Sequence, residues 1–141
     1  MQITFDTSQV DRNLKKILKA FPEATKQAMS NAVAVVEEEA KENCPVDTGT
    51  LRSSIKGEVK QEGKKINGYV YTNEEYAIDV HFGTGIYASD GQGRQTPWYF
   101  KDRKDKWHFF IGQEPKPFLQ DAINSKQREV LQELGKVLDY V

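Results

Sequence analysis

The chain has 141 residues, 38% of them hydrophobic, which suits one domain over residues 1–141 with a single modest core. Lys and Arg number 20 and Asp and Glu 21, so the net charge of −1 excludes a global attraction to nucleic acid or an anionic membrane. No apolar run approaches the ~18 residues of a membrane span, and Met1–Phe5 lacks the layout of a signal peptide, so we expect a soluble protein made in a cytoplasm.

The N-terminal third predicts a short strand followed by two helices. Met1–Phe5 alternates apolar and polar residues, which is typical of a strand. Apolar residues at helical spacing predict a helix from Val10 to Phe21. Pro22 interrupts this helix, and the next helix can begin there. A stripe of small and apolar residues then continues to about Asn43. This second helix is therefore expected to be the longest and the central one.

A run of carboxylates marks the end of the long helix. Glu37, Glu38, Glu39 and Glu42 surround a single lysine, Lys41. Such a run is usually a solvated helix face, although carboxylates at a helix C-terminus oppose the macrodipole. A basic partner surface docking at Glu38 and Glu39 is the alternative interpretation, because it would offset that unfavourable placement.

The next stretch, "CPVDTGTLRSSI", contains Asp47-Thr48-Gly49, the tripeptide that holds the catalytic carboxylate of aspartic proteases. In those enzymes an apolar strand leads into the tripeptide within an almost all-β fold. Here a helical stripe and Pro45 precede it, so we interpret the stretch as a structural corner rather than a catalytic site. The corner residues are Pro45, Asp47, Thr48, Gly49, Leu51, Ser54 and Ile55.

Each corner residue has an expected backbone or packing task. Asp47 can accept hydrogen bonds from backbone N–H groups, and Gly49 tolerates positive φ. Leu51 and Ile55 are expected to enter the core. The single cysteine, Cys44, excludes an internal disulfide and is expected to be buried as a small hydrophobe, with a reactive thiol as the alternative.

Three alternating segments follow the corner. Ser54–Gln61 and Asn67–Thr72 flank a turn and predict a β-hairpin. Tyr76–Phe82 predicts a third strand, on which Asp79 and His81 would share one face. No motif ties a nucleophile to this pair, so we expect a partly exposed strand histidine rather than a catalytic one.

A glycine-rich loop comes next, at about residues 83–97, and we expect it to be mobile in the free protein. Its glycines do not match the spacing of nucleotide-binding loops. Trp98–Phe100 and Lys106–Ile111 then flank a charged turn and predict a second hairpin with aromatic walls. Beyond Pro115-Lys116-Pro117, apolar residues from Phe118 to Leu138 predict a closing amphipathic helix.

These elements predict an α+β fold. We expect a small antiparallel sheet of four or five strands packed against a long N-terminal helix pair and a C-terminal helix. Two histidines without metal-ligand spacing argue against structural zinc. We expect no catalytic residue, metal or cofactor.

The hairpin at 98–110 interleaves aromatic and basic residues, which could stack on and neutralise nucleic acid. Strand aromatics are more often cross-strand pairs, and two aspartates lower the local charge. A small nucleic-acid-binding module is therefore the alternative function. Its residues would be Trp98, Arg103, Lys104 and Trp107.

The motifs together resemble the head–tail joining or tail-completion (neck) family of long-tailed bacteriophages and prophages. The resemblance rests on "CPVDTGTLRSSI", "YAIDVHFGTG", "PWYF" and "GQEPKPFLQDAI", in the family's order over about residues 25 to 135. The matching positions are Pro45, Asp47, Thr48, Gly49, Leu51, Ser54, Ile55, Tyr76, Gly83, Thr84, Pro117, Phe118 and Leu119. The chain departs from the pattern at Val80-His81-Phe82, where the family often has a Glu before Gly-Thr.

The resemblance implies a structural virion protein of the tail or neck and not an enzyme. Before assembly, this protein would be in the host cytoplasm. It implies subunits that form a ring, commonly of six, between connector and tail tube. The implied partners are further copies of the chain, the connector or head-completion protein and the tail-tube protein, with no membrane and no direct DNA contact. The candidate partner interface comprises Glu38, Glu39, Gly83, Thr84, Gly85, Arg94, Trp98, Arg103 and Lys104.

Overall fold

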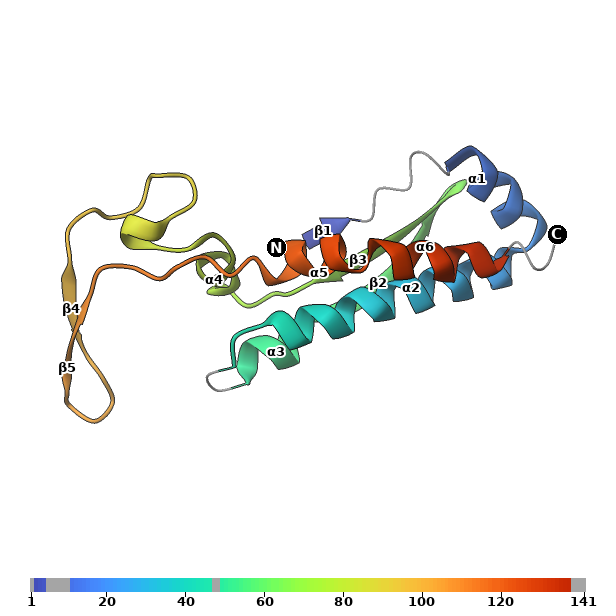
Figure 1. Ribbon diagram of the computed structural model, residues 1–141. Coiled ribbons are helices and arrows are strands. Elements are labelled where there is room, and N and C mark those ends of the chain that lie inside the picture. Colours follow the sequence, from blue (N-terminus) through green and yellow to red (C-terminus); the bar gives the residue numbers. More distant parts are fainter. Residues whose placement is uncertain (1, 5–10, 47–48, 138–141) are drawn as a thin grey trace. The chain divides into compact units, whose positions relative to one another are not determined.

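The computed structural model describes residues 2–4, 11–46 and 49–137 and has the predicted α+β class (Figure 1). Its contacts divide the chain into two compact units. The body unit comprises the residues up to Asn73 and those from Phe118 onward, and the hairpin unit is Glu74–Pro117. That the two units form one domain stays a prediction.

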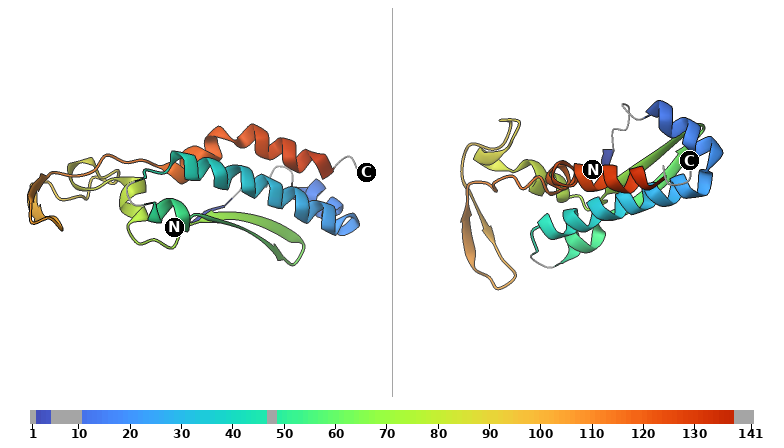
Figure 2. Two further views of the ribbon diagram at one scale, coloured as in Figure 1. Left: turned by 90° about the horizontal axis from the view of Figure 1, so that it is seen from below. Right: turned by 45° about the vertical axis from the view of Figure 1, so that its right-hand side comes forward.

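The centre of the body unit is α2 (Pro22–Asn43), the predicted long helix. It follows α1 (Asp11–Ala20) and contacts β2 (Lys56–Glu62) and β3 (Lys65–Tyr71) on one side. The C-terminal helices pack along its other side (Figure 2, left). Its buried residues are Thr25, Ala28, Met29, Ala32, Val33, Val36 and Ala40. Three of the seven are alanines, so the neighbouring layers can approach α2 closely.

The sheet of the body unit has three antiparallel strands in the order β1-β3-β2, with β1 at Gln2–Thr4. The β2–β3 hairpin lies where the sequence predicts it. Gly57 on β2 lies close to α2, because a Cβ there would lie 2.5 Å from Cγ1 of Val33. The helix and the sheet therefore pack together through a position without a side chain.

The prediction of a single sheet of four or five strands is wrong. The hairpin unit holds a separate two-stranded sheet of β4 (Trp98–Lys101) and β5 (Trp107–Phe110). The expected third strand at Tyr76–Phe82 is instead the helix α4 (Ala77–Phe82). Its buried residues are Ala77, Val80 and His81. They have the i, i+3, i+4 spacing of a helix face. The segment therefore buries one face of a helix rather than the alternate residues of a strand.

The closing segment forms two helices rather than the single one that we expected. They are α5 (Phe118–Ser125) and α6 (Gln127–Gly135), separated by Lys126 at φ −108° and ψ 13°. Ser125 Oγ donates a hydrogen bond to the Ala122 carbonyl at 3.2 Å. Such bonds offer the backbone an alternative to the regular helix ladder, which is consistent with the break.

The corner after α2 redirects the chain into α3 (Thr50–Ser54). Cys44 is extended, at φ −68° and ψ 130°, and Gly49 adopts φ 81° immediately before α3. Leu51 and Ile55 are buried in the body unit. Asp47 and Thr48 lie outside the described residues.

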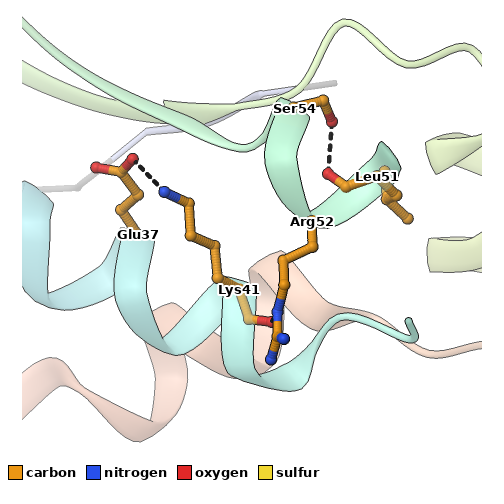
Figure 3. Close-up of polar contacts among 5 residues, drawn as sticks. All are labelled: Glu37, Lys41, Leu51, Arg52 and Ser54. Atoms are coloured by element: carbon orange, nitrogen blue, oxygen red, sulfur yellow. Dashed lines mark hydrogen bonds and ion pairs between the residues drawn. The ribbon is translucent and has the colours of Figure 1, made fainter. Parts of the chain in front are cut away.

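Polar contacts tie the corner to α2 (Figure 3) and to Thr72, the residue after β3. Arg52 Nε donates a hydrogen bond to the Lys41 carbonyl at 2.8 Å, at the C-terminal end of α2. Ser54 Oγ donates to the Leu51 carbonyl at 2.6 Å and lies 2.6 Å from Thr72 Oγ1. A guanidinium at this position satisfies a terminal carbonyl and complements the helix dipole.

Replacement of Arg52 by alanine is expected to lower the free energy of unfolding by about 1 kcal/mol, because the terminal carbonyl of α2 loses a charged donor. Urea denaturation measures the loss. Arg103→Ala, which removes an exposed arginine from the hairpin unit, is the control and should leave that transition unchanged. Equal stabilities for the two variants would show that the Arg52 contact contributes nothing.

The Cys44 side chain is buried beside this corner. Burial raises the pKa of the Cys44 thiol, and the positive charge of Arg52 offsets that rise in part. A buried thiol with a raised pKa holds little thiolate at neutral pH. Of the two interpretations of this cysteine, the packed hydrophobe therefore fits the structure better than the reactive thiol.

Candidate functional site

The hairpin of β4 and β5 has aromatic rings on both of its faces. The register pairs Trp98 with Phe110 and Phe100 with His108 on one face, and these rings contact one another at centroid distances of 5.0 and 5.1 Å. A ring-to-ring arrangement of this kind stabilises two paired strands. Arg94 adds a guanidinium 5.2 Å from the Trp98 ring centroid. This first face is therefore held by contacts within the hairpin unit.

The opposite face of the hairpin is open to solvent. Tyr99, Trp107 and Phe109 alternate with the residues of the first face, and their exposed fractions are 66%, 68% and 58%. Tyr99 and Phe109 contact each other across the strands, and Lys101 Nζ lies 5.8 Å from the Trp107 ring centroid. We call these three rings the open aromatic face. Exposed apolar groups that are gathered in one place mark interaction surfaces.

The turn that joins the two strands is organised by Asp102. Its Oδ1 accepts hydrogen bonds from the backbone N–H groups of Lys104 and Lys106, at 2.8 and 2.9 Å. Its Oδ2 lies 2.7 Å from Nε2 of His108. The pKa of the Asp102 carboxyl lies below its usual value, mainly because of the hydrogen bond with His108 and secondly because of the hydrogen bond from the Lys106 N–H.

The pKa of Asp102 predicts how the hairpin responds to acid. Because the pKa is lower in the closed hairpin than in an open chain, the carboxylate stabilises the hairpin fully above the ordinary value of 3.8. That contribution is lost as the pH falls through the lower, folded value. The Lys104 and Lys106 amide signals should therefore report the acid transition of Asp102 below about pH 4.

Asp102→Asn should remove this acid transition, because the amide does not titrate. Asp105→Asn is the matched control, since Asp105 is a carboxylate of the same turn that forms an ion pair with Lys101, at 3.3 Å. A transition of the Lys104 amide that survives in Asp102→Asn would assign the acid response to another group.

A hollow of about 620 Å³ lies elsewhere on the hairpin unit. Ile78 and Phe82 of α4 line it and are 53% and 47% exposed. Gly83–Gly85 also line it, and the glycine-rich loop adds Ala88, Ser89, Asp90, Gln92 and Gly93. The lining residues that carry charge are Asp79 and Asp90.

Hydrogen bonds hold the base of the glycine-rich loop in place. Thr84 N–H donates to the Gln113 carbonyl at 3.0 Å, and Ile86 N–H donates to the Ile111 carbonyl at 3.1 Å. Ser89 N–H reaches back to the Phe82 carbonyl at 2.8 Å. Between these anchors the chain makes one 3₁₀ turn, η1 (Gly85–Tyr87). The base of the loop is thus a defined structure, and the mobility expected for the free protein stays a prediction.

The expected pairing of Asp79 with His81 on one face is wrong, because both lie on α4 and not on a strand. His81 is buried and its ring lies 4.6 Å from that of Phe82, whereas Asp79 is exposed. Within residues 2–4, 11–46 and 49–137, no group of three or more His, Cys, Asp or Glu side chains could hold a metal ion. Among these same residues, no helix is long and apolar enough to cross a membrane.

Comparison with known protein families identifies the chain. The model of a family described as "Bacteriophage HK97-gp10, putative tail-component" matches residues 8–83. The chain belongs to this HK97-gp10-like family. No curated protein and no solved structure matches the chain. As a member of a phage tail-component family, it has a structural role in the tail and belongs to the virion.

The match to the HK97-gp10-like family covers α1 to α4 and ends at Gly83. The corner, the β2–β3 hairpin and the α4 side of the hollow thus lie inside the matched region. The hairpin of β4 and β5 lies outside it. The part of this family member that exposes most aromatic surface is therefore also the part that the family model does not describe.

The structure distributes the predicted interface residues over both units. Gly83, Thr84 and Gly85 come together in the hollow, and Arg103 and Lys104 lie in the turn of the hairpin. Arg94 and Trp98 contact each other at the base of the hairpin. Glu38 and Glu39 are in the body unit, on α2.

The acidic run on α2 is partly paired within the body unit. Lys41 Nζ lies 3.1 Å from Glu37 (Figure 3), and Lys126 Nζ lies 3.8 Å from Glu39. Glu38 is exposed. These pairs lower the charge available to a basic partner, and a docking role for Glu38 and Glu39 stays a prediction.

Sequence reasoning did not include Ile78, Phe82, Tyr99 and Phe109 in the candidate interface. The strand interpretation of Tyr76–Phe82 hid the first two, which lie four residues apart on one side of a helix. The other two could have been found by applying strand alternation to the predicted hairpin, because Tyr99 faces Phe109 in the register.

Proposed function

We propose that this protein is a tail-completion or head–tail joining protein of the phage neck, which forms a ring at the interface between tail and connector during virion assembly. The observation that carries the proposal is the open aromatic face of Tyr99, Trp107 and Phe109. It belongs to a two-stranded hairpin, and such a hairpin is marginally stable alone in water. A partner that covers the rings would stabilise it.

Several copies of the chain, six by the resemblance, would form the ring, with the connector or head-completion protein on one side and the tail-tube protein on the other. The protein would remain in the host cytoplasm until it meets these partners. The body unit has a buried core of its own, centred on α2. It can therefore serve as the folded base from which the hairpin unit makes contacts.

The test is to mix the purified full chain with the connector or tail-tube protein of the same phage and to examine the products by electron microscopy and native mass spectrometry. We expect closed rings of one stoichiometry and slower amide exchange in residues 83–96 after assembly. A chain that stays monomeric with each of these proteins would overturn the proposal. Equal protection of residues 83–96 in the free and the assembled protein would remove this loop from the interface.

A nucleic-acid-binding module is the second candidate, and the turn of the hairpin favours it. Residues 98–110 carry four basic side chains against two aspartates, beside the exposed rings of Tyr99, Phe100, Trp107 and Phe109. Salt-sensitive binding to single-stranded or duplex DNA that Lys104→Glu abolishes would support it. Lys60→Glu, on the exposed strand β2, is the matched control. We expect no such binding, because Asp102 and Asp105 lie inside the basic turn.

A further inference from the structure

The hairpin unit carries two surfaces that complement each other but do not meet within the unit. One is the open aromatic face of Tyr99, Trp107 and Phe109. The other is the hollow between α4 and the glycine-rich loop, whose lining includes no residue of β4 or β5. Each copy of the chain thus presents both a projecting and a receiving surface.

The size and the apolar wall of the hollow suit an aromatic group. The hollow has a volume of about 620 Å³, within the roughly 300–1,000 Å³ of pockets that bind compact groups. Ile78 and Phe82 give it an apolar wall. Trp107 and Tyr99 are the most exposed aromatic side chains of the described residues, so they can enter such a hollow with little rearrangement of the hairpin.

The charges of the two surfaces have opposite signs. Asp79 and Asp90 line the hollow, and its described lining includes no lysine or arginine. The turn of the hairpin exposes Arg103, Lys104 and Lys106. The aspartates of that turn are occupied within the hairpin, Asp102 by the backbone and His108 and Asp105 by Lys101. Four basic side chains, of Lys101, Arg103, Lys104 and Lys106, outnumber these two aspartates, so the turn presents a net positive charge to a partner.

We propose that the open aromatic face of one copy docks in the hollow of the next copy, with the basic turn against Asp79 and Asp90. This inference deepens the proposed function and rests on it for the ring. The two surfaces of such a contact differ, so the interface is heterologous. A heterologous interface closes into a ring or continues into a filament, depending on the rotation between copies.

The test uses two full-length variants, each with one damaged surface. Trp107→Ala weakens the projecting surface, and Ile78→Ser weakens the hollow. Each alone is expected to lower the self-association constant about tenfold or more, as loss of a central anchor does. A mixture of the two retains one intact projecting surface and one intact hollow. We therefore expect it to form one-to-one pairs and to stop there, as measured by sedimentation and native mass spectrometry.

Leu131→Ala is the matched control, because Leu131 is 58% exposed on α6, in the body unit. It should associate as the wild type does. The one-to-one complex of the two damaged variants also shows that both are folded. A charge-swap pair adds an independent measurement: Lys104→Glu should weaken self-association, and combination with an Asp79→Lys chain should restore it.

The outcomes separate this inference from the proposed function. Wild-type rings that Trp107→Ala and Ile78→Ser also form would overturn the docking and leave the ring function standing. If the wild type forms open filaments and both variants abolish them, the docking is supported and the ring is refuted. A wild-type chain that does not self-associate, alone or with the connector, would overturn both. DNA binding that is lost in Trp107→Ala, with unchanged self-association, would show that the open aromatic face binds nucleic acid instead of another copy.

Discussion

Alanine at position 85 is expected to disrupt the base of the hairpin unit, whereas alanine at position 91 is not. Both glycines have positive φ, 62° and 70°. A Cβ on Gly85 would overlap the Ile111 carbonyl oxygen and lie 2.6 Å from the Gly112 Cα, while a Cβ on Gly91 has no atom within 4 Å. The two substitutions therefore share a backbone cost and differ only in the space available.

The expected cost is about 1 kcal/mol for Gly91→Ala and about 3 kcal/mol or more for Gly85→Ala, since a backbone neighbour cannot rotate away. Amide exchange at Ile86 measures the effect, because its N–H is bonded to the same Ile111 carbonyl. We expect strong acceleration in Gly85→Ala alone, together with loss of assembly. Similar exchange in both variants would mean that the loop base yields easily.

The second large effect is expected where the sheet meets α2. Alanine in place of Gly57 would bring its Cβ to 2.5 Å from Cγ1 of Val33 and 2.9 Å from Oε2 of Glu37. Glu37 can move its carboxylate, but the branched and buried Val33 cannot. Strand and helix must separate slightly, so the free energy of unfolding should fall by about 1–3 kcal/mol.

A double-mutant cycle tests the cause of that loss. Val33→Ala alone should destabilise the protein by leaving a cavity, but it also removes the atom that obstructs position 57. Gly57→Ala should therefore cost less in the Val33→Ala background, with a coupling of about 1 kcal/mol in chemical denaturation. Additive losses would place the strain of Gly57→Ala elsewhere than at Val33.

The helices α1 and α2 of the body unit were predictable because their signals are long and local. The stripe from Thr25 to Ala40 keeps helical spacing over several turns, and Pro22 marks the start of α2. The β2–β3 hairpin was equally plain, since two alternating runs flank a turn that contains Gly63 at φ 62°. In such segments the burial pattern and the backbone preference agree.

The segment Tyr76–Phe82 was not predictable in the same way. In so short a run, apolar residues at every second position also fall at i and i+4, which suits a helix. The burial of Ala77, Val80 and His81 by contacts in the folded chain decides between the two. Neighbours from distant parts of the sequence supply such contacts, so a local pattern does not contain them.

The candidate site shows the same division. The aromatic and basic content of residues 98–110 can be read from the sequence, and strand alternation then assigns each ring to a face. That Tyr99, Trp107 and Phe109 stay more exposed than the rings of the other face is decided by the folded hairpin unit. The hollow could not be predicted from the sequence, because residues 78–93 form it by folding back on themselves.

The sequence by itself determined the α+β class, the central helix, both hairpins and the resemblance to a phage tail family. Periodicity, turn residues and short motifs each depend only on residues that are close together in the sequence. The tertiary structure decided three other features. They are the division of the strands into two sheets, the helical state of Ala77–Phe82, and the juxtaposition of Ile78 and Phe82 with the glycine-rich loop. Each depends on which distant residues bury a given side chain, and burial free energy is a property of the folded chain.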